Sequence, residues 1–469
     1  MKKIVFKTGK MAAAGLALAL AVGTAGCSGG SETGNSSAKE AAMDAQEDGA
    51  DSENGVSDSQ ENSVSTENGE SQEAQLPEYT PVDPASVAES AEEDFIFEDQ
   101  GDGLIYITGY QGAGGQVKIP AHLGGAERII IKSDAFKTNE TITYIYIPET
   151  VTRIEEYSFR DCPALEEAYV AGQALTIEKS TFRGCTALRR VELAEGVTGI
   201  EGSMDSGAFQ DCTSLTEVVF PNSLNNRIEI NAFYGCTALE TVDLSNTQLL
   251  GIGQMAFGYC ENLKTVKLPA TLQWVESNSF LGTPALAEFT VGAGNAVLEV
   301  EDGIVYTLDF CGPESPNTAL LGLEGAAGED VAIREGTEKI ASHAFSHNYT
   351  IKTLKLPDSV KEIDGRAFSD CGNLAQVDFG NGLETIDEHG FEFCPKLEEI
   401  ELPASLTELG DGSFSFCGLK KVALPDNVKY TSGTTQDYVF SGNEEVVFTY
   451  LGQEYTYDQA AQLDSFLVK

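Results

Sequence analysis

Eight cysteines of this chain stand three residues after a phenylalanine, a regular spacing that could present thiols as nucleophiles, metal ligands or disulfide partners. The pairs are Phe159/Cys162, Phe182/Cys185, Phe209/Cys212, Phe233/Cys236, Phe257/Cys260, Phe368/Cys371, Phe391/Cys394 and Phe414/Cys417. In the same frame, Phe136, Phe280 and Phe345 are followed by Asn139, Thr283 and Asn348. All three residue types are small and can hydrogen-bond a backbone group, whereas only cysteine is a nucleophile or a strong zinc ligand. We therefore interpret the position as a buried structural column and not as a reactive site.

Two other patterns could carry chemistry, and neither lies in the structural setting that it needs. His343 and His347 have the four-residue spacing of a helical zinc site, but they flank Phe345 at a corner of a repeat. We interpret them as exposed or capping side chains. The G-x-S-x-G sequence of residues 26–30 lies across a signal cleavage point and not on a strand-to-helix turn. We accordingly predict no catalytic residue, no metal site and no cofactor.

The phenylalanines also define a repeat that must position these residues. Successive ones lie 23, 23, 27, 24, 24, 23, 65, 23, 23 and 23 residues apart, so one unit recurs along the chain. Each unit reads Leu-x-x-Val-x-Leu-Pro, then Leu/Val-x-x-Ile, then Ala-Phe-x-x-Cys. The alternation of Val266 and Leu268 predicts a short strand, the following proline a corner, and Ile363 in its unit a second extended piece. The phenylalanine segment is predicted to turn back as one helical turn.

A single unit cannot bury its own apolar face, so the units must stack into a solenoid. Stacking places equivalent residues about 4.8 Å apart, which also permits disulfides between column cysteines. Because Asn and Thr interrupt the column and would leave their neighbours unpaired, we expect free, buried thiols. An insertion at about residues 287–333 breaks the period, and alternating apolar residues around Asp302-Gly303 predict a hairpin there. Cys311, beyond that hairpin, is interpreted as a packed small residue, with a reactive surface thiol as the alternative.

These units resemble the BspA-like leucine-rich repeats, in which IP-x-x-V-x-x-I-x-x-x-AF-x-x-C-x-x-L recurs in tandem. The resemblance covers residues 95–469, including a lead-in, "YITGYQGAGGQVKIPAHLGG", and a closing segment, "YLGQEYTYDQAAQLDSF". It implies a β-rich leucine-rich-repeat solenoid with short helical turns, of the right-handed α/β superhelix class, over residues 95–425, and a closing segment over 426–469. It also implies a secreted or surface-exposed bacterial protein, often adhesive, without catalytic activity.

The N-terminal part is predicted to export the chain and to hold it at a distance from the membrane. Four lysines within the first ten residues precede an uncharged, small-residue run that ends at Cys27. Ala25-Gly26-Cys27 resembles a bacterial lipobox, which implies cleavage before Cys27 and diacylation of its thiol; ordinary secretion is the alternative. We assign residues 1–27 to a lipoprotein signal peptide. Residues 28–94, with 18 acidic residues against one basic, are predicted to be a disordered tether.

The charge of the chain excludes one class of partner. Of the formal net charge of −45, the signal carries +4 and the tether −17, which leaves −32 on residues 95–469. Such a surface repels nucleic-acid phosphates and anionic lipid headgroups. We therefore predict no nucleic-acid binding, and membrane contact only through the lipid anchor.

The position between Val and Leu of each first strand points outward and forms a candidate partner-binding column. Its N-terminal end holds Tyr146, Tyr169 and Glu192, with Asp243 further along and Tyr144 beside it. Tyrosine is enriched at protein interfaces, although cross-strand pairing that only protects the sheet is an equal alternative. We predict a non-enzymatic lipoprotein, anchored to the bacterial membrane and exposed at the cell surface, that binds a protein ligand or mediates adhesion. A carbohydrate- or envelope-binding module is the alternative.

Overall fold

The part of the chain that can be described forms one compact unit, which begins at Tyr79. The computed structural model describes residues 79–173, 175–308, 317–426, 429–430 and 439–460. The predicted signal peptide, Cys27 and Cys311 lie outside these residues. Within them, no helix has both the length and the apolar character needed to cross a membrane.

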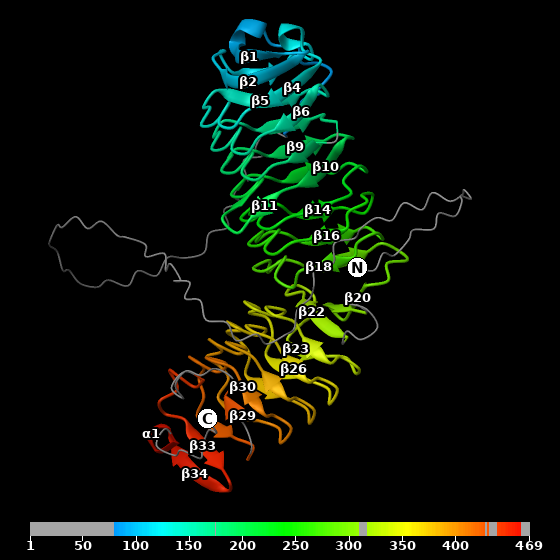
Figure 1. The fold of residues 1–469 in the computed structure, drawn as a ribbon. Coiled ribbons are helices and arrows are strands. Elements are labelled where there is room, and N and C mark those ends of the chain that lie inside the picture. Colours follow the sequence, from blue (N-terminus) through cyan, green and yellow to red (C-terminus); the bar gives the residue numbers. More distant parts are fainter. Residues whose placement is uncertain (1–78, 174, 309–316, 427–428, 431–438, 461–469) are drawn as a thin grey trace, which may run out of the picture. The chain divides into compact units, whose positions relative to one another are not determined.

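Each repeat unit forms one coil of a β-solenoid, and the coils stack in chain order (Figure 1). A representative coil begins with β5 (Ile142–Ile147) and turns at Pro148, whose carbonyl accepts the Val151 N–H at 3.0 Å. It continues with β6 (Val151–Ile154) and returns through the turn that contains Phe159. Because proline has no N–H for the sheet ladder, it ends the first strand at this corner. The predicted leucine-rich-repeat solenoid is confirmed.

The second strands of the coils build two long sheets. One contains β1 (Phe95–Gly101), β2 (Leu104–Tyr110), β4 (Arg128–Ile131), β6, β8 (Leu175–Ile177), β10 (Val197–Ile200), β14 (Arg227–Ile228), β16 (Gly251–Ile252) and β18 (Trp274–Val275). The other contains β20 (Leu298–Glu301), β21 (Ile304–Thr307), β22 (Thr318–Gly322), β24 (Lys339–Ile340), β26 (Glu362–Ile363), β28 (Thr385–Ile386), β30 (Glu408–Leu409) and β32 (Lys429–Tyr430).

The first strands build shorter sheets. The one that matters most below, the tyrosine sheet, contains β3 (Gly115–Lys118), β5, β7 (Glu167–Val170), β9 (Arg190–Leu193) and β13 (Glu217–Val219). Two further sheets are β15 (Thr241–Asp243), β17 (Thr265–Leu268), β19 (Glu288–Val291), and β23 (Asp330–Ala332), β25 (Thr353–Lys355), β27 (Gln376–Asp378). The last contains β29 (Glu399–Glu401), β31 (Lys421–Ala423), β33 (Val447–Tyr450) and β34 (Gln453–Thr456).

A phenylalanine in place of the usual leucine marks two of the points where these shorter sheets stop. Phe220 follows β13, and Phe379 follows β27; neither strand pairs with the first strand of the next coil. Phe220 packs edge-on against Phe233, and Phe379 packs edge-on against Phe391. A phenylalanine ring needs more room between coils than leucine does, and we infer that it separates the neighbouring strands.

Each long sheet starts with an antiparallel hairpin whose turn is Asp-Gly. β1 and β2 meet at Asp102-Gly103, and β20 and β21 meet at Asp302-Gly303. All four turn residues have positive φ, between 48° and 75°, as a two-residue type I′ turn requires. The hairpin predicted at Asp302-Gly303 is therefore confirmed. The 287–333 insertion acts as a second starting element for the solenoid.

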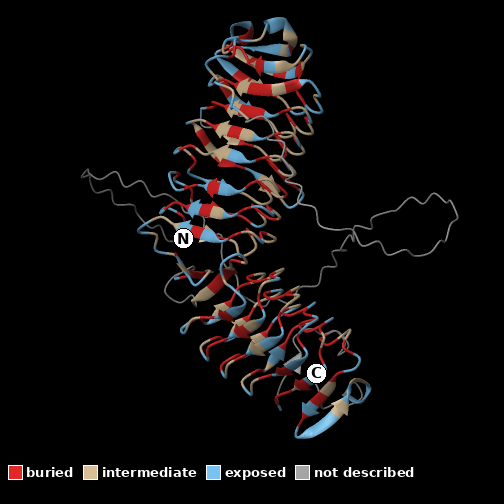
Figure 2. Cartoon of the chain, turned by 180° about the vertical axis from the view of Figure 1, so that it is seen from behind, coloured by how far each residue is buried: buried red, intermediate tan, exposed pale blue. Residues whose placement is uncertain are grey.

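Stacked phenylalanine rings form the centre of the core. From Phe136 to Phe280, neighbouring rings lie 4.6–5.4 Å apart and within 12° of parallel. A second stack runs from Phe345 to Phe440 with separations of 5.0–5.7 Å. Buried and exposed segments recur from coil to coil, as Figure 2 shows. The column is thus the core predicted from the repeat, extended by Phe440.

The phenylalanine turns are not helical, so that prediction is wrong. The residue two places after each phenylalanine of the column has positive φ, and in most turns the residue two places before it does too, as in Thr138 (56°) and Asp134 (61°) around Phe136. This backbone directs N–H groups toward the next coil: Phe136 N–H donates to Ser158 O, and Thr138 N–H to Arg160 O, each at 2.8 Å. A helical turn would use those groups within itself. The helices of the described residues are α1 (Tyr457–Ala460) and the 3₁₀ turns η1 (Glu92–Asp94) and η2 (Leu123–Gly125).

Candidate partner-binding face

The cysteine column is buried, and each thiol has a structural partner. All eight column cysteines are free and at most 8% exposed. Each Sγ lies 3.0–3.3 Å from the carbonyl oxygen of the phenylalanine one coil earlier, as in Cys162 to Phe136 and Cys260 to Phe233. Burial also raises the pKa of the Cys260 thiol to about 12, which opposes thiolate formation. The column cysteines therefore hydrogen-bond the backbone, which indicates a structural role.

The non-cysteine members of the column lie at the ends of the two ring stacks. Asn139 and Asn348 belong to the first ring of each stack, and their Oδ1 atoms accept backbone N–H groups two and three residues later. Thr283, at the last ring of the first stack, donates to its own Phe280 carbonyl at 2.6 Å. Asn443 closes the second stack and donates to Phe414 O at 3.0 Å. Residue identity in the column therefore follows the position of a coil in its stack.

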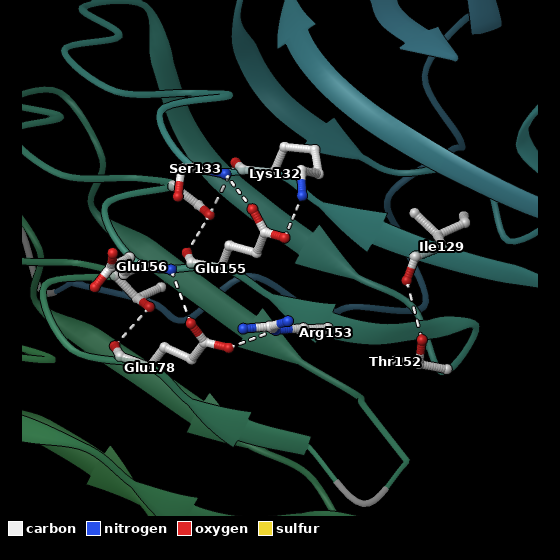
Figure 3. Close-up of polar contacts among 10 residues, drawn as sticks. Ile129, Lys132, Ser133, Thr152, Arg153, Glu155, Glu156 and Glu178 are labelled. Atoms are coloured by element: carbon white, nitrogen blue, oxygen red, sulfur yellow. Dashed lines mark hydrogen bonds and ion pairs between the residues drawn. The ribbon is translucent and has the colours of Figure 1, made fainter. Parts of the chain in front are cut away.

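The acidic side chains that follow the second strands accept hydrogen bonds from the backbone. Glu155 Oε2 accepts the Ser133 N–H, and Glu178 Oε2 accepts the Glu156 N–H, both at 3.1 Å (Figure 3). Each carboxylate thus bonds to the coil before its own. Glu155 also pairs with Lys132, while the other oxygen of Glu178 lies 2.7 Å from Arg153 Nε. No group of three His, Cys, Asp or Glu residues within the described ranges is arranged to hold a metal ion.

His343 and His347 flank Phe345 in the positive-φ places of its turn and not on a helix, the setting that their spacing would need for a zinc site. His343 Nδ1 lies 2.8 Å from Ser342 Oγ, and His347 Nδ1 lies 2.9 Å from Ser346 Oγ. Burial, and then the charge of Arg366, lower the pKa of His343 to about 4. Both rings are half-buried rather than exposed.

Two columns of side chains lie on the outward face of the tyrosine sheet. The first column is Lys118, Tyr146, Tyr169, Glu192 and Val219, which are register partners on successive strands. The second column, two residues earlier in each strand, is Gln116, Tyr144, Glu167, Arg190 and Glu217. The predicted outward alignment of Tyr146, Tyr169 and Glu192 is confirmed.

Tyr146 and Tyr169 form a half-buried, parallel pair at the centre of the first column. Their ring centroids are 4.9 Å apart with an interplanar angle of 5°, and Lys118 Nζ lies 4.6 Å from the centroid of Tyr146. Burial, followed by nearby charges that include Glu149, raises the pKa of both hydroxyls, which keeps them neutral. The pair therefore presents ring edges and neutral hydroxyl groups to solvent.

A segment of the same chain covers the second column. Residues 79–90, the strap, cross the tyrosine sheet and precede η1 and β1. Both carboxylate oxygens of Glu167 accept the Val82 N–H, at 3.0 and 3.2 Å. At the other end, Ser90 N–H donates to Lys118 O at 2.9 Å, and Lys118 N–H donates to Ser90 Oγ at 3.2 Å. Residues 79–94, predicted as part of the disordered tether, therefore belong to the folded unit.

Tyr144 lies beneath this strap and is not an exposed contact residue. Only 2% of Tyr144 is exposed, so the prediction that it would share an exposed aromatic cluster with Tyr146 and Tyr169 is wrong. The backbone pleat does place Tyr144 on the outward face, as predicted, but the strap removes it from solvent. Burial and the neighbouring Glu167 raise the pKa of its hydroxyl.

The predicted acidic residues differ in position. Glu192 adjoins Tyr169 and pairs with Arg190 Nη2 at 2.8 Å. Asp243 lies in the next sheet, beyond the break at Phe220, and pairs with Lys267 Nζ at 3.1 Å. The structure therefore brings Glu192, but not Asp243, into the sheet of the tyrosine pair.

Sequence reasoning missed a second exposed aromatic pair, on the turns of the later coils. Phe393 and Phe416 are 46% and 50% exposed, with ring centroids 5.1 Å apart and planes 10° apart. Both have positive φ, which is rare for a bulky side chain. The available signal was a second phenylalanine immediately before the cysteine, in "FEFC" and "FSFC", where the other column cysteines follow Asp, Gly or Tyr.

Comparisons with known proteins support the fold. The sequence matches the model of the BspA type leucine rich repeat region in six copies, over residues 125–206, 202–301 and 325–446. A leucine rich cell surface protein from Faecalibacterium prausnitzii is similar in structure, with TM-score 0.57 and 21% identity over 82% of this chain and 98% of that one. The pneumococcal vaccine antigen PcpA gives TM-score 0.48 and 18% identity over 76% and 91% of the two chains. No curated protein matches the sequence.

Proposed function

Because the chain belongs to the BspA type leucine-rich repeat family, we propose that it is a non-enzymatic surface protein that binds other proteins through the tyrosine sheet. Solenoids bind partners through extended faces more than through one pocket. The observation that carries the proposal is the parallel Tyr146–Tyr169 pair, which lies half-exposed at the centre of an outward column. Tyrosine combines a large apolar body with a polar tip, the combination enriched at protein interfaces.

The orientation of the two rings favours a protein ligand over a carbohydrate. A sugar ring stacks on the open face of an aromatic ring, where its C–H groups meet the negative π surface. In this pair the inner faces cover each other, and Lys118 lies over the Tyr146 ring. Ring edges and hydroxyls suit hydrogen bonds and side-chain packing. The carbohydrate-binding alternative therefore has less support at this face.

The surrounding charge supports a partner with basic groups. Glu149 and Glu192 lie close enough to Tyr169 to contribute to its raised pKa, and residues 95–469 carry a net charge of −32. Complementary charge increases the association rate and weakens as salt screens it. Raising the salt concentration from about 0.05 to about 0.5 M shortens the Debye length from about 14 to about 4 Å. Binding of the expected partner should therefore be weaker at the higher concentration.

The proposed location is the bacterial surface, with Cys27 as the lipid attachment site. The lipobox-like sequence before Cys27 and the description of the Faecalibacterium neighbour as a cell surface protein support this location. Labelling with a radioactive fatty acid tests the attachment. The wild type incorporates label, whereas Cys27→Ala does not; a processed, labelled Cys27→Ala protein contradicts the anchor.

A binding panel tests the choice between ligand classes. Immobilised basic and acidic extracellular proteins are compared with bacterial and host polysaccharides, using the wild type and the variant Tyr146→Ala/Tyr169→Ala. The proposal expects binding to basic proteins that the double substitution abolishes. Binding to polysaccharides alone, abolished by the same substitution, would instead establish the carbohydrate alternative.

A further inference from the structure

The second column of the tyrosine sheet already holds an extended peptide, contributed by the chain itself. The Val82 N–H is fixed on the Glu167 carboxylate, and the Tyr79 ring centroid lies 5.6 Å from the guanidinium of Arg189. The strap contains no strand. The Val82 N–H therefore donates to a side-chain carboxylate and not to the backbone of a sheet edge. The surface is therefore shaped to accept an irregular extended segment.

The strap leaves buried polar groups of this surface without partners. The Tyr144 hydroxyl is buried and completes no hydrogen bond within the described residues, and the buried Tyr79 hydroxyl has only the Glu167 carboxylate beside it. Glu167 is 4% exposed and lies next to both hydroxyls; burial, and then this carboxylate, raise the pKa of both tyrosines. Buried polar groups are normally paired, and an unpaired one weakens the contact that buries it. A ligand that pairs the Tyr144 hydroxyl binds this surface more favourably than the strap does.

Charge gives a second reason why a partner could replace the strap. The strap carries Asp83 and Glu89 and no basic residue, and it lies on a unit with a strongly negative charge. A segment with lysine or arginine in these places would exchange repulsion for attraction.

We propose that Tyr144, Glu167 and Arg189 form a subsite for an extended peptide of the protein partner, and that the strap is an internal ligand which this peptide displaces. The inference rests on the proposed function, because it gives the partner of the same sheet a defined chemistry. Tyr79 and Val82 indicate the spacing that a displacing peptide needs. An aromatic residue is followed three positions later by a residue whose backbone N–H can donate to Glu167. Displacement also uncovers Tyr144 beside Tyr146, which joins the two columns into one continuous face.

A peptide-binding experiment on the full chain tests the subsite. The release variant is Tyr79→Ala/Val82→Pro, because proline removes the N–H that Glu167 accepts. The control variant is Val82→Ala, which keeps that N–H. The probe is a fluorescent peptide with the strap's own sequence, YTPVDPASVAES, measured by fluorescence anisotropy. The release variant is expected to bind it at least tenfold more tightly than the wild type or Val82→Ala, and adding Glu167→Gln is expected to weaken that binding at least tenfold.

A measurement on the wild type keeps the inference testable if the release variant does not fold. Excess unlabelled strap peptide carrying Asp83→Lys and Glu89→Lys should accelerate hydrogen exchange of Val82 and Ser90 while leaving exchange in β16 and β18 unchanged. Equal peptide binding to all variants, or no effect of the peptide on strap exchange, would overturn the subsite. These readouts depend on Glu167 and not on the Tyr146–Tyr169 pair. A failure to find a partner for that pair would therefore leave this result standing.

Discussion

At the scale of single residues, the cysteines show how a repeat can imitate a reactive motif. Their spacing follows from the coil length, and substitution by Asn and Thr indicates that hydrogen bonding, not thiol chemistry, is required at this place. The structure identifies the acceptor as the phenylalanine carbonyl of the preceding coil. The sequence could not identify this acceptor, because the contact joins residues of neighbouring coils whose turn conformation was predicted wrongly.

Thiol titration tests the state of this column. In native protein the eight column thiols should not react with a soluble disulfide reagent, since they are buried and burial raises the pKa of Cys260 to about 12. Denaturation should release at least eight reactive thiols. A smaller increase would reveal disulfides within the column.

The rings of the core give a second test at this scale. Phe257 is fully buried, with Phe233 and Phe280 stacked 5.2 and 5.4 Å away. Phe257→Ala should reduce the free energy of unfolding by about 3–5 kcal/mol, as expected for a buried aromatic ring. Hydrogen exchange should accelerate mainly around β16 and β18, because coils contact only their neighbours. Uniform acceleration throughout the unit would contradict the solenoid description of stability.

At the scale of elements, the local sequence pattern was sufficient to predict the strands, the corners and the hairpin. It was not sufficient to predict the conformation of the phenylalanine turns. Alternation in Val266 and Leu268 and the Asp302-Gly303 pair are strong local signals. The phenylalanine turns depend on hydrogen bonds to the next coil, which a local pattern does not contain. The strap was missed for a similar reason. Its composition matches the acidic tether, and only contacts with Glu167 and Lys118 distinguish it.

The carboxylates that follow the second strands, such as Glu155 and Glu178 in Figure 3, lead to a prediction about the pH dependence of stability. Glu201 has the equivalent place after β10, and burial, then Glu178 and Glu229, raise its pKa above the ordinary value of a glutamate. The folded state therefore holds this proton more tightly than the unfolded chain, so the contribution of Glu201 to stability falls as pH rises through the raised pKa. The melting temperature of Glu201→Gln minus that of the wild type should therefore be more positive at pH 7 than at pH 4.

Glu195 supplies a matched control with the opposite sign. The backbone N–H groups of Asn222 and Ser223 donate hydrogen bonds to the Glu195 carboxylate. These bonds, first that of Asn222, favour the charged form and lower the pKa of Glu195. The stability it contributes is present above its ordinary pKa and is lost as pH falls. The melting temperature of Glu195→Gln minus that of the wild type should therefore be more negative at pH 7 than at pH 4. The same pH trend in both variants, measured by scanning calorimetry, would contradict the assignment.

At the scale of the whole molecule, the described unit consists of two ring stacks, each started by an Asp-Gly hairpin. The period and the family resemblance were sufficient to predict this solenoid. They were not sufficient to predict which outward residues remain accessible. That depends on the strap over Tyr144, on the sheet break at Phe220, and on the positive φ that exposes Phe393 and Phe416.

The molecule offers its own control for the binding proposal, because another accessible aromatic pair lies at a different place. Tyr146–Tyr169 lies on the tyrosine sheet, whereas Phe393–Phe416 lies on the turns of later coils. Truncating either pair removes two stacked aromatic rings from the surface. Only the first pair belongs to the proposed interface.

The most direct test of the central claim is therefore the dissociation constant of a protein selected by the panel, measured for two double variants by isothermal titration calorimetry. Tyr146→Ala/Tyr169→Ala should weaken binding at least tenfold, a loss of about 1.4 kcal/mol or more. Phe393→Ala/Phe416→Ala should leave binding unchanged, and both variants should keep the circular dichroism spectrum of the wild type. Unchanged binding by the tyrosine variant, together with a tenfold loss in the phenylalanine variant, would contradict the claim and place the interface on the turns.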